Sequence, residues 1–243
     1  MDVQEGFIVG IYNYCDRWCE TCAFTSRCRG FADHAEMEAE HDPHLKPVAE
    51  APPLPQDIPP PPPRWMQELI DEMNKLAHEP VSDDAYEKAR PKIAPEHESI
   101  ETRAHAYSES VHAWREARDS NSRYQPSDPR AVVAWFQYSI PAKIHRALSG
   151  LAYHNADEHD WPADHDGSAK VALLGIERSH AAWLELVHLG LASASEIEPF
   201  VAHLIWLSDE LERVFPKARA FVRPGFDEPE TVARLLAAES GRL

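Results

Sequence analysis

Apolar side chains recur every three to four residues along most of this chain, the spacing that places them on one face of a helix. In the segment 64–79, Trp65, Leu69 and Met73 fall on one such face. A single run, GFIVGIY, has the composition of a strand. The helical spacing predicts four further long helices and a short last one, over 96–119, 130–155, 168–190, 196–215 and 228–240.

Turn and cap residues mark the ends of these predicted helices. The stretches DSNSRYQPSDP and HDWPADHDGS are rich in residues that end helices, and they separate the first three long segments after residue 96. Ser195 is expected to cap the helix 196–215, whose first turn accommodates Pro199. We therefore predict an all-α protein whose body is a four-helix bundle, with the 64–79 helix packed alongside as an extra helix.

The chain divides by composition into three parts. Residues 1–31 hold every cysteine and form a small cysteine-rich module. Residues 32–63 are first acidic and then proline-rich, ending in the run IPPPPP, and such a run adopts the extended polyproline II conformation. We interpret this part as a strap over the helices, and residues 64–243 as the helical bundle.

Charge and hydropathy narrow the class of partner. The formal net charge of −17 argues against a nucleic-acid surface and against binding to anionic membranes, since both need cationic side chains. No run approaches the roughly 20 apolar residues that span a bilayer, and the acidic first residues do not resemble a secretory signal. We therefore expect a cytoplasmic protein, whose partner, if it is a protein, is basic.

The four cysteines of the chain, Cys15, Cys19, Cys22 and Cys28, lie within one short segment. Cytosolic thiols stay reduced, so two disulfides among them are not expected. The spacing C-x3-C-x2-C-x5-C crowds four ligands into one loop, as ferredoxin-type loops do for a [4Fe–4S] cluster. Structural zinc, which usually takes two separated pairs of ligands, is the alternative cofactor.

A second set of ligand-type residues falls on the predicted helices. A glutamate three residues before a histidine shares its helical face, and the chain has four such pairs. When the helices are aligned as antiparallel hairpins, one level gathers a candidate metal ligand from each of the four. These candidates are Glu109, His112, Glu177, His180, His105, His145, His203 and Glu210. One interpretation of this level is a metal centre with one or two iron ions. The alternative is that these histidines are ordinary surface and core residues that bind no metal.

Two Glu-x-x-His pairs within an all-α body resemble the ferritin-like di-iron carboxylate proteins. Rubrerythrins of that group combine the bundle with a cysteine-ligated iron centre, and here a cysteine module precedes the predicted bundle. The resemblance covers residues 96–215 and implies a di-iron site, although the helix 130–155 offers only Gln137 and His145 near its middle. The DinB-like metalloproteins, which bind one divalent metal through three histidines, are a second group that the pattern resembles.

These features predict a redox metalloprotein. A [4Fe–4S] cluster on the cysteines would exchange electrons with an iron centre in the bundle and with an electron donor or acceptor protein, which would make the chain an iron-dependent oxidoreductase. One alternative is an acidic helical interaction protein stabilised by zinc at the cysteines. A DinB-like metalloenzyme with a single metal ion is the other.

Overall fold

The computed structural model describes residues 3–41, 92–119, 124–156 and 164–228. The chain divides into two compact units, one made of residues 1–34 with 92–243 and the other of residues 35–91. Most of the second unit, including the proline strap and the predicted helix 64–79, lies outside the described residues, as does nearly all of the predicted helix 228–240. The described residues are mostly helical, which confirms that part of the prediction.

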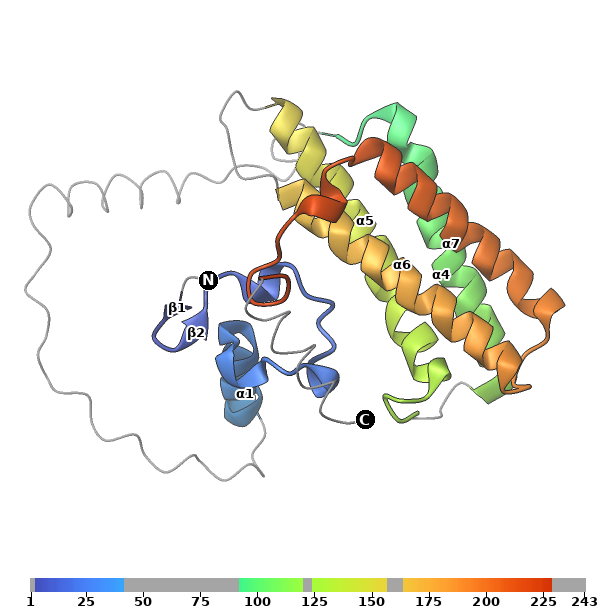
Figure 1. Ribbon diagram of the computed structural model, residues 1–243, viewed down its shortest axis with the longest axis horizontal. Helices are drawn as coiled ribbons and strands as arrows, with labels where there is room; N and C mark the ends of the chain where they lie inside the picture. The colour runs from blue at the N-terminus through green and yellow to red at the C-terminus, as the bar shows by residue number, and fades with distance from the viewer. Residues whose placement is uncertain (1–2, 42–91, 120–123, 157–163, 229–243) are drawn as a thin grey trace, which may run out of the picture. The chain divides into compact units, whose positions relative to one another are not determined.

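Four long helices make up the helical body of the first unit (Figure 1). They are α4 (Glu98–Asp119), α5 (Pro129–Ala156), α6 (Asp164–His188) and α7 (Ala194–Val214). The main contacts of α5 are with α4 and α6, and those of α7 are with α6 and α4, so each helix has two neighbours around a shared interior. None of the described helices is long and apolar enough to cross a lipid bilayer.

The predicted limits of these helices agree with the structure to within a few residues. The largest shift is at α6, which begins at Asp164 rather than at residue 168. The N-cap of α7 is Ser193 and not Ser195, because Ser193 forms a capping box in which its backbone N–H donates to the Glu196 carboxylate at 2.7 Å. Asp128 plays the same part for α5, since its carboxylate accepts from the backbone N–H of Arg130 at 2.8 Å.

The interior of the helical body is aromatic and apolar at its centre. Trp183 of α6 stacks on Phe200 of α7 with ring centroids 4.4 Å apart, and its edge faces Trp114 of α4. The hydroxyl of Tyr107 hydrogen-bonds Ser179 at 2.6 Å and accepts from the Trp183 indole at 3.3 Å. Burial raises the pKa of Tyr107 to about 12, so this phenol stays neutral and satisfies the polar groups around it.

The N-terminal segment of the same unit contains little regular structure. Strands β1 (Val3–Gln4) and β2 (Phe7–Ile8) form a small antiparallel hairpin in which Val3 pairs with Ile8. Only β2 lies within the run GFIVGIY that is expected to be a strand, and β1 precedes it. Helix α1 (Arg29–His41) is not among the predicted helices, although its alanine and glutamate content favours a helix. Between residues 3 and 34 only Ile8 and Ile11 are buried, so this segment has almost no core of its own.

The ring of Tyr14 lies directly against α6 at Gly167. A Cβ atom at Gly167 would stand 2.4 Å from Cε1 of Tyr14, closer than any real contact of that kind. The same ring packs against Phe221, with centroids 4.7 Å apart. A glycine at position 167 is therefore what allows the N-terminal segment to approach the helix so closely.

We expect Gly167→Ala to lower the free energy of unfolding by about 1–3 kcal/mol, the usual cost of overpacking. Urea unfolding monitored by circular dichroism measures it. In the background of Tyr14→Ala, where the ring is gone, the same substitution should cost clearly less. Equal costs in the two backgrounds would show that the contact with Tyr14 is not the reason for the glycine.

Candidate metal centre

The four cysteines line a single small recess of the N-terminal segment. All four thiols are free and half-buried. Aromatic side chains complete the wall of the recess, and they come from positions far apart in the sequence: Trp18, Phe24, Phe31 and Phe226. Four soft sulfur ligands in an apolar surrounding form the donor set that iron–sulfur clusters and structural zinc ions use.

Short helical turns bring the four sulfur atoms to this recess. One turn covers Cys19–Thr21 and ends at Cys22, whose backbone N–H donates to the Cys19 carbonyl at 3.1 Å. A second turn covers Thr25–Arg27 and ends at Cys28, which donates in the same way to the Thr25 carbonyl. Cys19 thus begins the first turn, Cys22 and Cys28 each follow a turn directly, and Cys15 precedes the first turn. Each turn changes the direction of the chain around the recess.

The backbone just before the first turn adopts an unusual conformation. Arg17 has a φ of +59°, in the left-handed region that non-glycine residues seldom occupy. The Asp16 carboxylate accepts a hydrogen bond from the backbone N–H of Trp18 at 3.1 Å and so stabilises the bend. This bend separates Cys15 from Cys19 and lets both line the recess.

The thiols influence one another's ionisation. Burial raises the pKa of the Cys19 thiol, and the charges of the other three thiols raise it further. Burial also raises the pKa of Cys22, although the backbone N–H of Phe24 donates to its sulfur at 3.4 Å and partly offsets the effect. Four thiolates without a metal would therefore repel one another, and a bound cation would remove that repulsion while protons are released.

Within the described ranges, no three or more His, Cys, Asp or Glu side chains are placed to hold one metal ion. This statement applies to the four cysteines and to the eight candidate ligands on the helices.

Two contacts attach the cysteine loop to α5. The indole of Trp18 stacks on that of Trp135, with centroids 5.4 Å apart and planes 12° from parallel. The Trp135 Nε1–H donates to the Asp16 carbonyl at 2.9 Å. No local sequence pattern indicates that Trp135 contacts the cysteine loop, because it lies on a helix 119 positions from its hydrogen-bond partner.

The α6 helix adds an ion pair to this attachment. Arg178 is paired with the Asp16 carboxylate, the same group that stabilises the bend before the first turn. Asp16 therefore links the conformation of the cysteine loop to the helical body through both its carboxylate and its backbone carbonyl.

The segment that follows α7 closes over the other side of the loop. The ring of Phe226 packs edge-on against Phe24, with centroids 5.1 Å apart. Gly225 has a φ of +78° and lies so close to Ile11 that a Cβ atom would be 2.9 Å from the Ile11 side chain. The C-terminal part of the described chain thus completes a recess whose ligands are all near the N-terminus.

A half-buried carboxylate holds this closing segment in place. Asp227 pairs with Lys170 of α6 at 2.8 Å and with Arg223 at 2.8 Å. Burial alone would raise the pKa of Asp227, but the hydrogen bonds from Arg223 and Lys170 outweigh it and hold the pKa well below its usual range. The charged form of Asp227 therefore stabilises the fold.

The structure places most of the predicted ligands of the helices in separate surface contacts. Glu177 pairs with Arg219, and Glu210 pairs with Arg213. The remaining candidates are dispersed as well: His145 pairs with Glu101, His112 lies 3.3 Å from the Tyr138 hydroxyl, His105 and Glu109 are exposed, and His180 and His203 are half-buried. The structure does not bring these eight side chains together.

The interior at the predicted level is occupied by other residues. Ser179 and Trp183 of α6 face Tyr107 of α4 there, while Glu177 is exposed. Residues at one height on neighbouring helices share a site only when they also point inward. Equal distance from a turn fixes the height alone, so the alignment could not decide which side chains meet.

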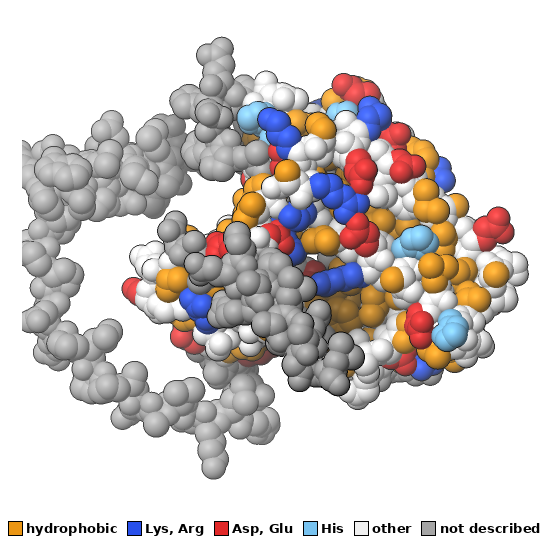
Figure 2. All heavy atoms as spheres, in the orientation of Figure 1, with side chains coloured by type: hydrophobic (Ala, Val, Ile, Leu, Met, Phe, Trp, Pro, Cys, Tyr) orange, Lys and Arg blue, Asp and Glu red, His pale blue; other side chains and the backbone are white. Residues whose placement is uncertain are grey.

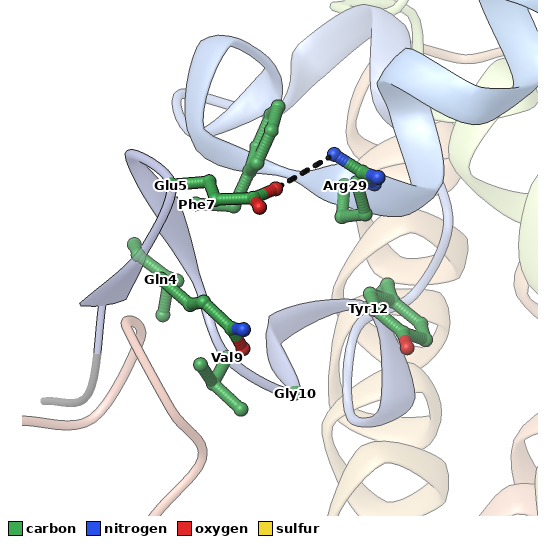
Figure 3. A pocket seen from close by; sticks show the side chains of 8 residues that line it. Gln4, Glu5, Phe7, Val9, Gly10, Tyr12 and Arg29 are labelled. Atoms are coloured by element: carbon green, nitrogen blue, oxygen red, sulfur yellow. Dashed lines mark hydrogen bonds and ion pairs between the residues drawn. The ribbon is translucent and has the colours of Figure 1, made fainter. Parts of the chain in front are cut away.

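A second recess lies at the hairpin, as Figure 3 shows. It has a volume of about 350 Å³, and the Glu5 carboxylate and the Arg29 guanidinium point toward one another across one side of it, 3.4 Å apart. The guanidinium also lies over the Phe7 ring. These contacts fasten the start of α1 to the hairpin, and the recess includes no cysteine.

Comparison with known proteins supplies no relative for this arrangement. No family model, no curated protein and no solved structure matches the chain.

We expect Asp227→Asn to lower the free energy of unfolding at pH 7 by about 2 kcal/mol, because two cations lose a half-buried charged partner. The pKa of this carboxyl group is depressed in the folded protein. Its stabilisation is therefore complete above the unfolded pKa of about 4 and declines as the pH falls below it. Urea unfolding at pH 7 and pH 3 should show a smaller difference between variant and wild type at the lower pH.

Asp209→Asn is the matched control, since Asp209 is an exposed carboxylate on α7. That variant should unfold like the wild type at both values of pH. A cost for Asp227→Asn that does not change with pH would contradict the assignment of the effect to charge.

Proposed function

We propose that this chain is an iron–sulfur electron-transfer protein in which Cys15, Cys19, Cys22 and Cys28 hold a [4Fe–4S] cluster. The observation that carries the proposal is the convergence of all four thiols on one recess walled by aromatic rings. A bound cluster of this kind accepts and returns one electron at a time. The chain's own residues would bind it, shield it and set its surroundings.

The spacing of the thiols favours a cluster over a single zinc ion. Zinc needs its four sulfur ligands close together around one point, at about 2.3 Å from the metal. In a cubane cluster each thiolate binds a different iron at one corner, so the four sulfur atoms stand farther apart. The sequence spacing C-x3-C-x2-C-x5-C, which places four thiols around one recess, resembles ferredoxin-type loops and so favours the second arrangement.

The surroundings of the recess also suit a group of negative charge. The chain as a whole is strongly acidic, yet Arg17 lines the recess and the Lys143 ammonium interacts electrostatically with Cys15. Cations and apolar walls near a cluster are among the features by which a protein adjusts its reduction potential. Because the cysteines are only half-buried, electrons would have a short path to a donor or acceptor protein at the surface.

The helical body serves in this proposal as the support of the recess and not as a second metal centre. Some of its candidate ligands are engaged in ion pairs, such as Glu177 with Arg219, and the others lie apart from one another at exposed or half-buried positions. Pairing with a cation lowers the affinity of a carboxylate for metal, since the metal must displace that cation. The proposal therefore includes no partner iron inside the helices.

Anaerobic purification followed by iron, zinc and sulfide assays tests the proposal. We expect about four iron and four sulfide per chain, together with a broad visible absorption band that bleaches on reduction. Cys22→Ser should lower the iron and sulfide content severely, because it removes one of four ligands. Ser26→Ala, an exposed position in the same loop, is the matched control and should leave both contents unchanged.

Two other outcomes would replace the proposal. A colourless protein with about one zinc and no sulfide would favour a zinc-stabilised interaction protein. Iron in excess of sulfide that disappears in Glu177→Ala would restore a metal centre in the helical body.

A further inference from the structure

A cleft of about 450 Å³ lies where the cysteine loop meets α5. The loop contributes Asp16 and Arg17, and α5 contributes a stripe of side chains along its exposed side. This stripe consists of Ala134, Trp135, Tyr138, Ser139, Ala142, Lys143 and Arg146. The cleft has the size of sites that bind small organic molecules, and most of its lining is apolar.

One cation in this cleft has no directly bound partner. Lys143 has 9% of its surface exposed, and its ammonium makes no hydrogen bond or ion pair with any residue in the described part of the chain, although Cys15 and Asp16 attract it from farther away. Burying an unpaired ammonium is costly, so such a group usually has a partner. Burial lowers the pKa of Lys143, and a bound anion would oppose that effect.

Two other charged groups of the cleft are paired. Arg146 binds Asp164 through two nitrogens, and the Asp16 carboxylate pairs with Arg178. The guanidinium of the exposed Arg17, like the ammonium of Lys143, makes no hydrogen bond or ion pair with a described residue. Two cations, one deep and one exposed, are thus available to a ligand.

Figure 2 shows Lys and Arg side chains over the middle of the helical body, with Asp and Glu side chains among them and an apolar area beside them. A molecule with one charged end and an apolar remainder suits this cleft better than a free inorganic anion does, because an inorganic anion makes no favourable contact with the apolar lining.

We propose that this cleft binds a small organic carboxylate with a flat apolar body. The carboxylate would lie between Lys143 and Arg17, and the apolar part would lie along Trp135 and the alanines of α5. The carboxylate would neutralise one of the two positive charges, and the other would remain hydrated at the exposed Arg17. The proposal does not depend on which metal the cysteines hold.

Isothermal titration calorimetry of the full chain, as purified without oxygen, tests this with naphthoate as the probe and naphthamide as its neutral counterpart. We expect naphthoate to bind at one site, and naphthamide at least tenfold more weakly because it lacks the charge. Lys143→Met keeps the shape of the side chain, and it should weaken naphthoate binding at least tenfold. It should leave naphthamide binding unchanged.

Lys92→Met, at an exposed lysine that does not line the cleft, is the matched control and should bind naphthoate like the wild type. The thermal midpoint of Lys143→Met should not fall, since the substitution removes a buried unpaired charge. Absence of naphthoate binding to the wild type at millimolar concentration would overturn the proposal. Equal affinity of Lys143→Met and the wild type would do so as well.

Discussion

The contact on which the candidate centre depends is the stack of Trp18 on Trp135. The cysteine-bearing segment buries only Ile8 and Ile11 and cannot hold four thiols in place by its own packing. The stack joins it to α5, and the Trp135 indole also binds the backbone carbonyl of Asp16, at the bend from which the cysteine turns begin. Pairs of aromatic rings add about 0.5–1.5 kcal/mol beyond the apolar area that they bury.

The opposite side of the loop depends on the segment after α7. Phe226 covers Phe24, and Gly225 allows the backbone to approach the buried isoleucines. Asp227 fastens this segment to α6 through Lys170. The recess is thus held between two parts of the fold that are distant in the sequence. Such a design places the metal-binding residues on a support with two independent attachments.

The two sites proposed for this molecule meet at the same junction. The cysteine recess and the cleft proposed to bind a carboxylate both include Asp16 and Arg17 in their linings. Asp16 shapes the bend, binds the Trp135 indole through its carbonyl and pairs with Arg178. A ligand in the cleft would therefore lie next to residues that position Cys15 and Cys19.

The sequence by itself determined the four long helices and the grouping of the cysteines. Helix limits follow from local periodicity and capping residues, and four ligands within one short loop remain neighbours in any fold. Which helical residues point inward was decided by packing: Ser179 and Trp183 face the core, whereas Glu177 faces outward to Arg219. The partners of the loop, Trp135 and Phe226, were likewise decided by the tertiary structure. Contacts across more than a hundred residues leave no local pattern, because they depend on how the helices dock and not on the neighbours of each residue in the chain.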